Sequence, residues 1–149
     1  RYITTAQDVL LDAINRYPND KYVADSMYTL AKICSEKKDH SSAIRYIKVL
    51  IEKYPYFHKY AELYHYLGMQ YAINGDIIEA ISALNIAISK YPKYRTADLS
   101  VITLGRIYED AKYCGKAIET YYMIISDYPS SKYRGYANMH ISALRNIMP

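Results

Sequence analysis

The pentapeptide IEKYP (residues 51–55) has three near copies in this chain of 149 residues. The copies are INRYP (14–18), ISKYP (88–92) and ISDYP (125–129). Their prolines are separated by equal intervals of 37 residues, at Pro18, Pro55, Pro92 and Pro129. Self-similarity at a fixed period of about 20 to 50 residues is typical of solenoids and repeat arrays. The spacing therefore predicts a repeat protein whose units end at Tyr-Pro.

Apolar residues precede each proline at the spacing of one helix face. Before Pro92 they are Ala80, Leu84, Ala87 and Ile88, at i, i+4, i+7 and i+8. This stripe predicts an amphipathic helix, which we call helix B, that ends where proline prevents its continuation.

A second apolar stripe lies upstream in the same unit, at Tyr64, Leu67, Gly68 and Tyr71. Its spacing of i, i+3, i+4 and i+7 predicts another amphipathic helix, helix A. Stacked A–B pairs bury each other's apolar faces, so we predict an all-α fold, a right-handed α-α superhelix of about eight antiparallel helices.

The period also divides the chain, which we expect to be a single domain over residues 1–149. A half repeat (1–18, helix from about 3 to 17) precedes three full repeats (19–55, 56–92 and 93–129), and a half repeat (130–149, helix from about 132 to 147) follows. Small residues recur in helix A at Ala31, Gly68 and Gly105, where we expect two helix backbones to approach closely.

The turn from helix A to helix B has a clear signature in one unit. Gly75 tolerates the left-handed conformation that closes a helix, and Asp76 is a good N-cap residue. The third unit has Tyr113 in the Asp column, so we expect that turn to be irregular and to use Gly115.

These columns resemble the tetratricopeptide repeat (TPR) family, whose Leu-Gly, Tyr, Ala and Pro positions match Leu67, Gly68, Tyr71, Ala80 and Pro92. The next unit repeats the match at Leu104, Gly105, Tyr108, Ala117 and Pro129. The period of 37, longer than the common period of about 34, places three extra residues after each Tyr-Pro. With its YPSSKY junction (128–133), the chain resembles BamD-like outer-membrane assembly lipoproteins and CpoB-like periplasmic proteins.

This resemblance implies a protein-binding scaffold without catalytic activity, in the bacterial periplasm or on the periplasmic face of the outer membrane. The alternative is a general adaptor, periplasmic or cytoplasmic, or a self-assembling protein that pairs through its open terminal faces. The chain begins at Arg1, so we expect a piece of a longer protein from which any export signal or lipid anchor near the membrane has been removed.

In such solenoids one flank of helix A lines a concave groove for a protein or peptide. One position off the buried stripe, the expected groove residues are Tyr28, Lys32, Glu62, His65, Met69, Leu99, Ile102, Arg106, Tyr136, Met139 and His140. The alternative is that some of them pack against neighbouring helices. The Lys and Asn constellation with which some members grip a C-terminal carboxylate is not reproduced.

A basic column recurs every 37 residues in the B-to-A junctions, at Lys21, His58, Arg95 and Lys132. Such a basic edge could meet anionic lipid headgroups or an acidic protein, or be a solvated rim. The net charge of +4 is mild and dispersed, so nucleic acid is not an expected partner.

The residue pattern also argues against a metal site, a cofactor or an enzymatic activity. Cys34 and Cys114 are 80 residues apart without neighbouring ligands, and the few histidines are scattered, so we expect no metal site and no cofactor. Phosphate-binding glycine loops and nucleophile turns are likewise missing from the sequence, so we expect no enzyme. No apolar run approaches the roughly 18 residues of a transmembrane helix.

Overall fold

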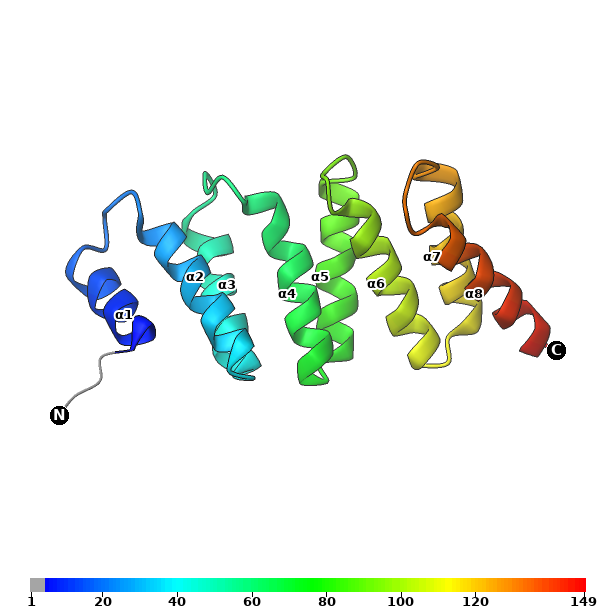
Figure 1. Cartoon of the computed structure of the whole chain (residues 1–149), viewed down its shortest axis with the longest axis horizontal. Helices are drawn as coiled ribbons and strands as arrows, with labels where there is room; N and C mark the ends of the chain where they lie inside the picture. The colour runs from blue at the N-terminus through cyan, green and yellow to red at the C-terminus, as the bar shows by residue number, and fades with distance from the viewer. Residues whose placement is uncertain (1–4) are drawn as a thin grey trace.

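A computed structural model describes residues 5–149, which form eight α-helices and contain no strand. The helices are α1 (Ala6–Arg16), α2 (Val23–Glu36), α3 (His40–Lys53), α4 (Tyr60–Asn74), α5 (Ile77–Lys90), α6 (Ala97–Asp110), α7 (Cys114–Asp127) and α8 (Arg134–Ile147). They stack side by side into an elongated solenoid with α1 and α8 at opposite ends (Figure 1). The predicted all-α repeat fold is confirmed; the expected helix start near residue 3 lies outside the described residues.

The helices keep the period of the sequence. Helices α2, α4, α6 and α8, the A helices, begin 37 residues apart, and so do α3, α5 and α7. All four B-to-A junctions lie on one long edge of the solenoid, and the three A-to-B turns lie on the opposite edge (Figure 1). A residue type that recurs every 37 residues therefore forms a row along the molecule.

Each helix that precedes a junction ends at the tyrosine of Tyr-Pro. Tyr17, Tyr54, Tyr91 and Tyr128 share one C-cap conformation, with φ from −127° to −129° and ψ from 51° to 60°. Proline disfavours the helical conformation of the residue before it, so this uniform exit follows from the sequence. The identical exits give the four junctions the same starting direction.

The three A-to-B turns also share one geometry, against our expectation for the third. Lys38, Gly75 and Lys112, one period apart, all have positive φ, at 66°, 89° and 65°. The amide after each donates to a helix carbonyl five residues earlier, as from Tyr113 to Tyr108 at 2.8 Å. Lys112 therefore takes the left-handed role, and Gly115 lies within α7. The repeat packing imposes the turn although lysine disfavours it.

Close helix contact explains the glycines of helix A, as the sequence predicted. A Cβ atom on Gly68 would lie 2.6 Å from Leu84 Cγ, and one on Gly105 would lie 2.5 Å from Tyr121 Cε1. Leu84 and Tyr121 occupy the same column of helix B, and both are fully buried. The larger Tyr121 fits because Gly105 leaves room for its ring.

We expect Gly105→Ala to lower the free energy of unfolding by about 1–3 kcal/mol, because the new methyl group overpacks against Tyr121. Gly115→Ala is the matched control, since nothing lies within 4 Å of its added Cβ and the residue is helical. That change should raise stability by up to about 1 kcal/mol. Urea unfolding followed by circular dichroism measures both, and equal effects would contradict the close packing.

At the third turn we expect Lys112→Gly to stabilise the protein by up to about 1 kcal/mol, because glycine adopts positive φ without the steric cost of a side chain. The neighbouring residue Ala111 has φ of −78°, so Ala111→Gly should destabilise by a similar amount. Thermal unfolding of the two variants gives the comparison. A loss of stability in Lys112→Gly would show that the left-handed turn is wrong.

Candidate protein-binding surface

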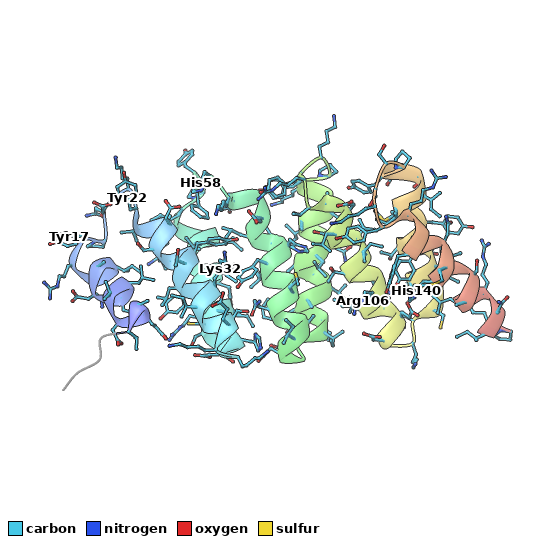
Figure 2. All side chains as sticks on the ribbon, in the orientation of Figure 1. Tyr17, Tyr22, Lys32, His58, Arg106 and His140 are labelled. Atoms are coloured by element: carbon cyan, nitrogen blue, oxygen red, sulfur yellow. The ribbon has the colours of Figure 1, made fainter. Side chains whose placement is uncertain are left out.

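The A helices form one face of the solenoid, which we call the A face. Lys32, Arg106 and His140, from α2, α6 and α8, lie across it in Figure 2. Of the expected groove residues, Lys32, Arg106 and Met139 are exposed. Glu62, Met69, Leu99, Tyr136 and His140 are half-buried. Tyr28, His65 and Ile102 are buried, so they form the floor of this face and are not open to a partner.

Tyr28 joins the first two A helices. Its ring packs against Phe57 and Tyr66, with centroids 5.6 and 6.0 Å apart. Lys59 Nζ lies 5.1 Å from the centre of the Tyr28 ring. Burial is the main reason that the pKa of Tyr28 rises to about 12. The phenol thus stays neutral, and its contacts hold α2, α4 and the junction between α3 and α4 together.

His65 plays the corresponding part between α4 and α6. Its Nδ1 lies 2.8 Å from Ser100 Oγ, and both residues are buried. Burial lowers the pKa of the imidazole, because desolvation penalises the charged form. Glu62, one turn earlier in α4, accepts a hydrogen bond at 3.1 Å from Tyr94 in the junction that precedes α6, so the same end of α4 is tied to that junction as well.

A polar network that we did not predict connects the last repeat. His140 Nδ1 lies 2.8 Å from Glu109 Oε2, and the hydroxyl of Tyr121 donates to the same carboxylate at 2.7 Å. Tyr136 stacks on His140, with ring centroids 4.0 Å apart. Burial raises the pKa of Tyr121 well above its ordinary value. The network thus connects Tyr136 and His140 of α8 to α6 and α7. No pattern in the sequence marks Glu109 as a member of this network.

One part of the A face is hollow and apolar. A cavity of about 260 Å³ lies between α4 and α6. It is lined by Met69, Ala72, Ile73, Thr103, Arg106, Ile107 and Asp110. Ile73 is 59% exposed, so its apolar side chain is open to a partner at the margin of this cavity. Met69 and Arg106 were expected here, whereas Ile73 lies one turn beyond the residues that we had considered.

The basic edge is exposed at all four of its predicted residues, Lys21, His58, Arg95 and Lys132. Two of them lie near an acidic residue of the preceding A helix. His58 Nε2 is 3.7 Å from Asp25 Oδ1, and Arg95 Nη2 is 3.8 Å from Glu62 Oε1. The contact between Arg95 and Glu62 is long, so it reduces the local charge only in part, and the contact between His58 and Asp25 is an ion pair only when the imidazole is protonated.

The described residues offer no cluster of three or more His, Cys, Asp or Glu side chains that could hold a metal ion. Among the helices of residues 5–149, none is long and apolar enough to cross a membrane.

We expect stability to fall as the pH drops below about 6.5, because the unfolded chain protonates His65 before the folded protein does. His65→Asn retains a polar group for Ser100 and removes this titration, so its stability should depend less on pH. Urea unfolding between about pH 7.5 and pH 5.5 measures the slopes. His58→Asn controls for the loss of an exposed histidine, and equal slopes for the parent and His65→Asn would contradict the expectation.

Three solved structures have a similar fold. A crystal structure of MamA protein is 24% identical, with a TM-score of 0.74, and the match covers 94% of this chain and 70% of that one. A second MamA structure has 21% identity, a TM-score of 0.69, and coverage of 94% and 85%. TPR-like repeats that bear the name of a Podosopora anserina kinesin light chain have 13% identity, a TM-score of 0.74, and coverage of 94% and 76%. At these identities the likeness shows the fold alone.

Sequence comparison gives the family. No curated protein sequence matches the chain. The family model described as outer membrane lipoprotein, YfiO, matches residues 2–149, nearly the whole length. The chain is therefore a tetratricopeptide-repeat protein that belongs to the YfiO outer membrane lipoprotein family.

Proposed function

We propose that this protein is a non-catalytic scaffold whose A face binds a segment of another protein. The observation that carries the proposal is the apolar cavity between α4 and α6, with the exposed Ile73 at its margin. Burying this side chain against a partner would stabilise a complex by roughly 25 cal/mol for each Å² of apolar surface removed from water.

The lining of the cavity indicates what kind of segment it accepts. Met69, Ala72, Ile73 and Ile107 offer apolar surface, and methionine adapts its shape to different partners. Arg106 and Asp110 place one positive and one negative charge at the same cavity, in positions to pair with polar groups beside an inserted apolar side chain. A peptide with one apolar anchor flanked by polar residues fits this surface.

The rim of the A face extends the contact along the solenoid. Lys32 is an exposed cation on α2, and Met139 on α8 is 61% exposed. Glu62, Leu99 and Tyr136 are half-buried between them. The buried Tyr28, His65 and Ile102 act indirectly, because they fix the spacing of the A helices to which the rim residues belong.

We further propose that the scaffold works in the assembly of outer-membrane proteins, on the periplasmic side of that membrane. Membership of the outer membrane lipoprotein family supports this setting, and the BamD-like junctions support the role. A general adaptor with another partner is the alternative.

We expect Ile73→Glu to weaken partner binding by at least about tenfold, because the apolar contact is lost and a charged carboxylate has to lose its water when the partner binds. Ile78→Glu is the control, since Ile78 lies on α5 and is 80% exposed. A photo-cross-linking residue at position 103 in the source cells identifies the bound species, and Ile73→Glu should remove its adducts while Ile78→Glu keeps them.

The identity of the adducts tests the cellular role. Adducts with outer-membrane β-barrel proteins or with their assembly proteins support it, together with a lower level of folded barrels in Ile73→Glu cells. Adducts with a second copy of this chain would favour self-association instead. Adducts that persist unchanged in Ile73→Glu would contradict binding at the cavity.

A further inference from the structure

The net positive charge of the chain is concentrated in the four B-to-A junctions. We define the junction edge as residues 16–22, 53–59, 90–96 and 127–133, from the last residue of each B helix (α1, α3, α5 and α7) to the N-cap of the next A helix. These segments contain eight Lys and Arg residues against two Asp residues, a net charge of +6. The whole chain carries +4, so all the remaining residues together carry −2.

The fold turns this asymmetry of the sequence into an asymmetry of the molecule. All four junctions lie on one long edge (Figure 1). The corresponding A-to-B segments on the opposite edge, residues 36–39, 73–76 and 110–113, contain three Lys and four acidic residues, a net charge of −1. The protein therefore has one basic edge and one nearly neutral edge.

Exposed tyrosines accompany the charges. Tyr56 is 98% exposed, and Tyr17 and Tyr22 are 63% and 61% exposed. Figure 2 shows Tyr17, Tyr22 and His58 along the junction edge. A tyrosine so exposed at a loop tip makes no contribution to the core, but its apolar ring and hydroxyl suit the boundary between water and a lipid bilayer.

The cations lie beside such rings. Lys21 Nζ is 4.8 Å from the centre of the Tyr22 ring, and Lys132 Nζ is 5.2 Å from that of Tyr133. Arg95 lies 6.0 Å from the ring of Tyr94. Three of the four junctions thus present a cation and an aromatic ring together.

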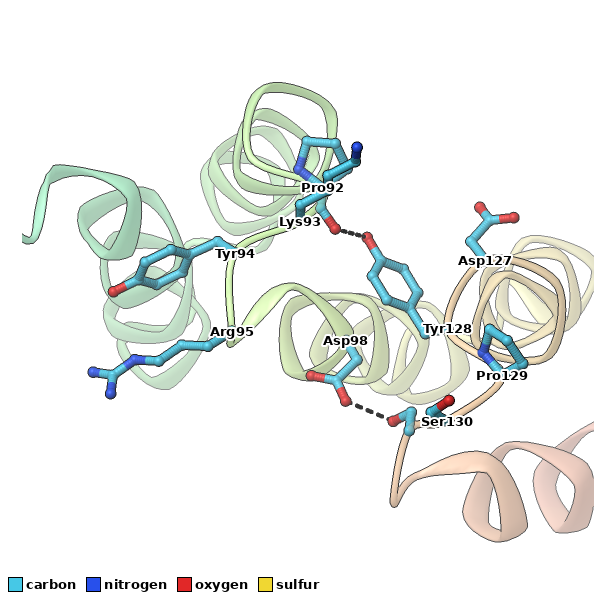
Figure 3. Close-up of a pocket in the computed structure, with 10 residues that line it drawn as sticks. Pro92, Lys93, Tyr94, Arg95, Asp98, Asp127, Tyr128, Pro129 and Ser130 are labelled. Carbon is cyan, nitrogen blue, oxygen red and sulfur yellow. Dashed lines mark hydrogen bonds between the residues drawn. The ribbon is translucent and has the colours of Figure 1, made fainter.

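Hydrogen bonds hold the fourth junction against the third junction and against α6. The hydroxyl of Tyr128 donates to the carbonyl of Pro92 at 2.8 Å, and Ser131 donates to Asp98 at 2.6 Å (Figure 3). An open pocket of about 410 Å³ lies between these two junctions, and its charged lining residues are Lys93, Arg95, Asp98 and Asp127. A similar pocket of about 300 Å³ occurs two repeats earlier, between the first two junctions. Two hollows therefore separate protruding loops on this edge, one between the first and second junctions and one between the third and fourth.

We propose that the junction edge docks on the surface of an anionic lipid bilayer. Headgroup phosphates would pair with Lys21, Lys93, Arg95 and Lys132, and Tyr22 and Tyr56 would enter the interface. The four junctions carry a charge of +6, which Asp25, Glu62 and Asp98 beside them reduce in part, and the remaining positive charge is complementary to such a surface. A fluid bilayer also follows loops and hollows along the whole length, whereas an acidic protein would need a matching contour. The proposal is independent of the cavity on the A face.

Vesicle co-sedimentation with the purified chain tests the proposal. The probe is vesicles of phosphatidylcholine with one third phosphatidylglycerol, compared with vesicles of phosphatidylcholine alone. We expect binding to the anionic vesicles alone, and binding should weaken when the ionic strength rises from about 0.05 to about 0.3 M, because salt screens exposed charges. Equal binding to both vesicles, or no binding to either, would overturn the proposal.

Two variants of equal net charge distinguish the effect of the junction edge on binding from the effect of the total charge. Lys21→Glu, Lys93→Glu, Arg95→Glu and Lys132→Glu together should reduce binding at least about tenfold, since each cation near a membrane contributes about 1 kcal/mol. The control changes four exposed lysines at or beside the opposite edge to Glu, namely Lys37, Lys38, Lys112 and Lys116. It should bind the anionic vesicles more tightly than the first variant does. Equal loss in both would overturn the proposal, and circular dichroism verifies that both are folded.

A tyrosine pair distinguishes a bilayer from an acidic protein surface. Tyr56→Ser should weaken vesicle binding a few-fold, whereas Tyr113→Ser, on the opposite edge and 57% exposed, should not. Polyglutamate in solution, which offers charge without an interface, should compete weakly. Tight binding to polyglutamate with no effect of Tyr56→Ser would assign the edge to an acidic protein and overturn the bilayer proposal.

Discussion

The fold depends on the close contact between helix A and helix B within each pair. At Gly105 and Tyr121 the two helices approach so closely that one added methyl group would overlap the tyrosine ring. Such contact fixes the angle and the distance of each pair, and an error there would repeat along the solenoid. A single pair still leaves apolar faces uncovered, so the side chains of the next repeat are needed to bury them.

Much of this architecture could be predicted because it depends on local rules that recur. Tyr-Pro ends four helices in one conformation, and a glycine column marks the close contacts. The third A-to-B turn was predicted wrongly for a related reason. Lysine disfavours positive φ, at a cost of about 1–2 kcal/mol. The helix packing that a regular turn preserves stabilises the protein by more than this cost. In a repeat protein the register of neighbouring units outweighs the preference of one residue.

The functional surface was harder to predict from the sequence. Counting one position off the buried stripe assumes that each A helix is covered on one flank, yet α4 has A helices on both sides. His65 of α4 is buried, and so is Ile102 of α6, which likewise lies between two A helices, α4 and α8 (Figure 1). Tyr28 of α2 is covered by Phe57 and Tyr66. The contacts among Glu109, Tyr121 and His140 join three helices and have no shared spacing, so no pattern along the chain could reveal them. Met139 and Lys32 are exposed on the A face, as simple periodicity predicts, and their part in binding stays a prediction.

The 37-residue period connects the two proposed surfaces. Lengthening a loop by a few residues costs little free energy, roughly 0.6 kcal/mol for each doubling of its length. The longer junctions therefore leave the helix packing intact while they place six-residue loops at the edge of every repeat. Side chains at the tips of these loops, such as Tyr56, are free of the core and can vary with the surroundings of the protein. The A face has no such freedom, because its floor also holds the repeats together. A partner bound there has to fit a surface already constrained by stability, whereas the junction edge can acquire charge at almost no cost to the fold.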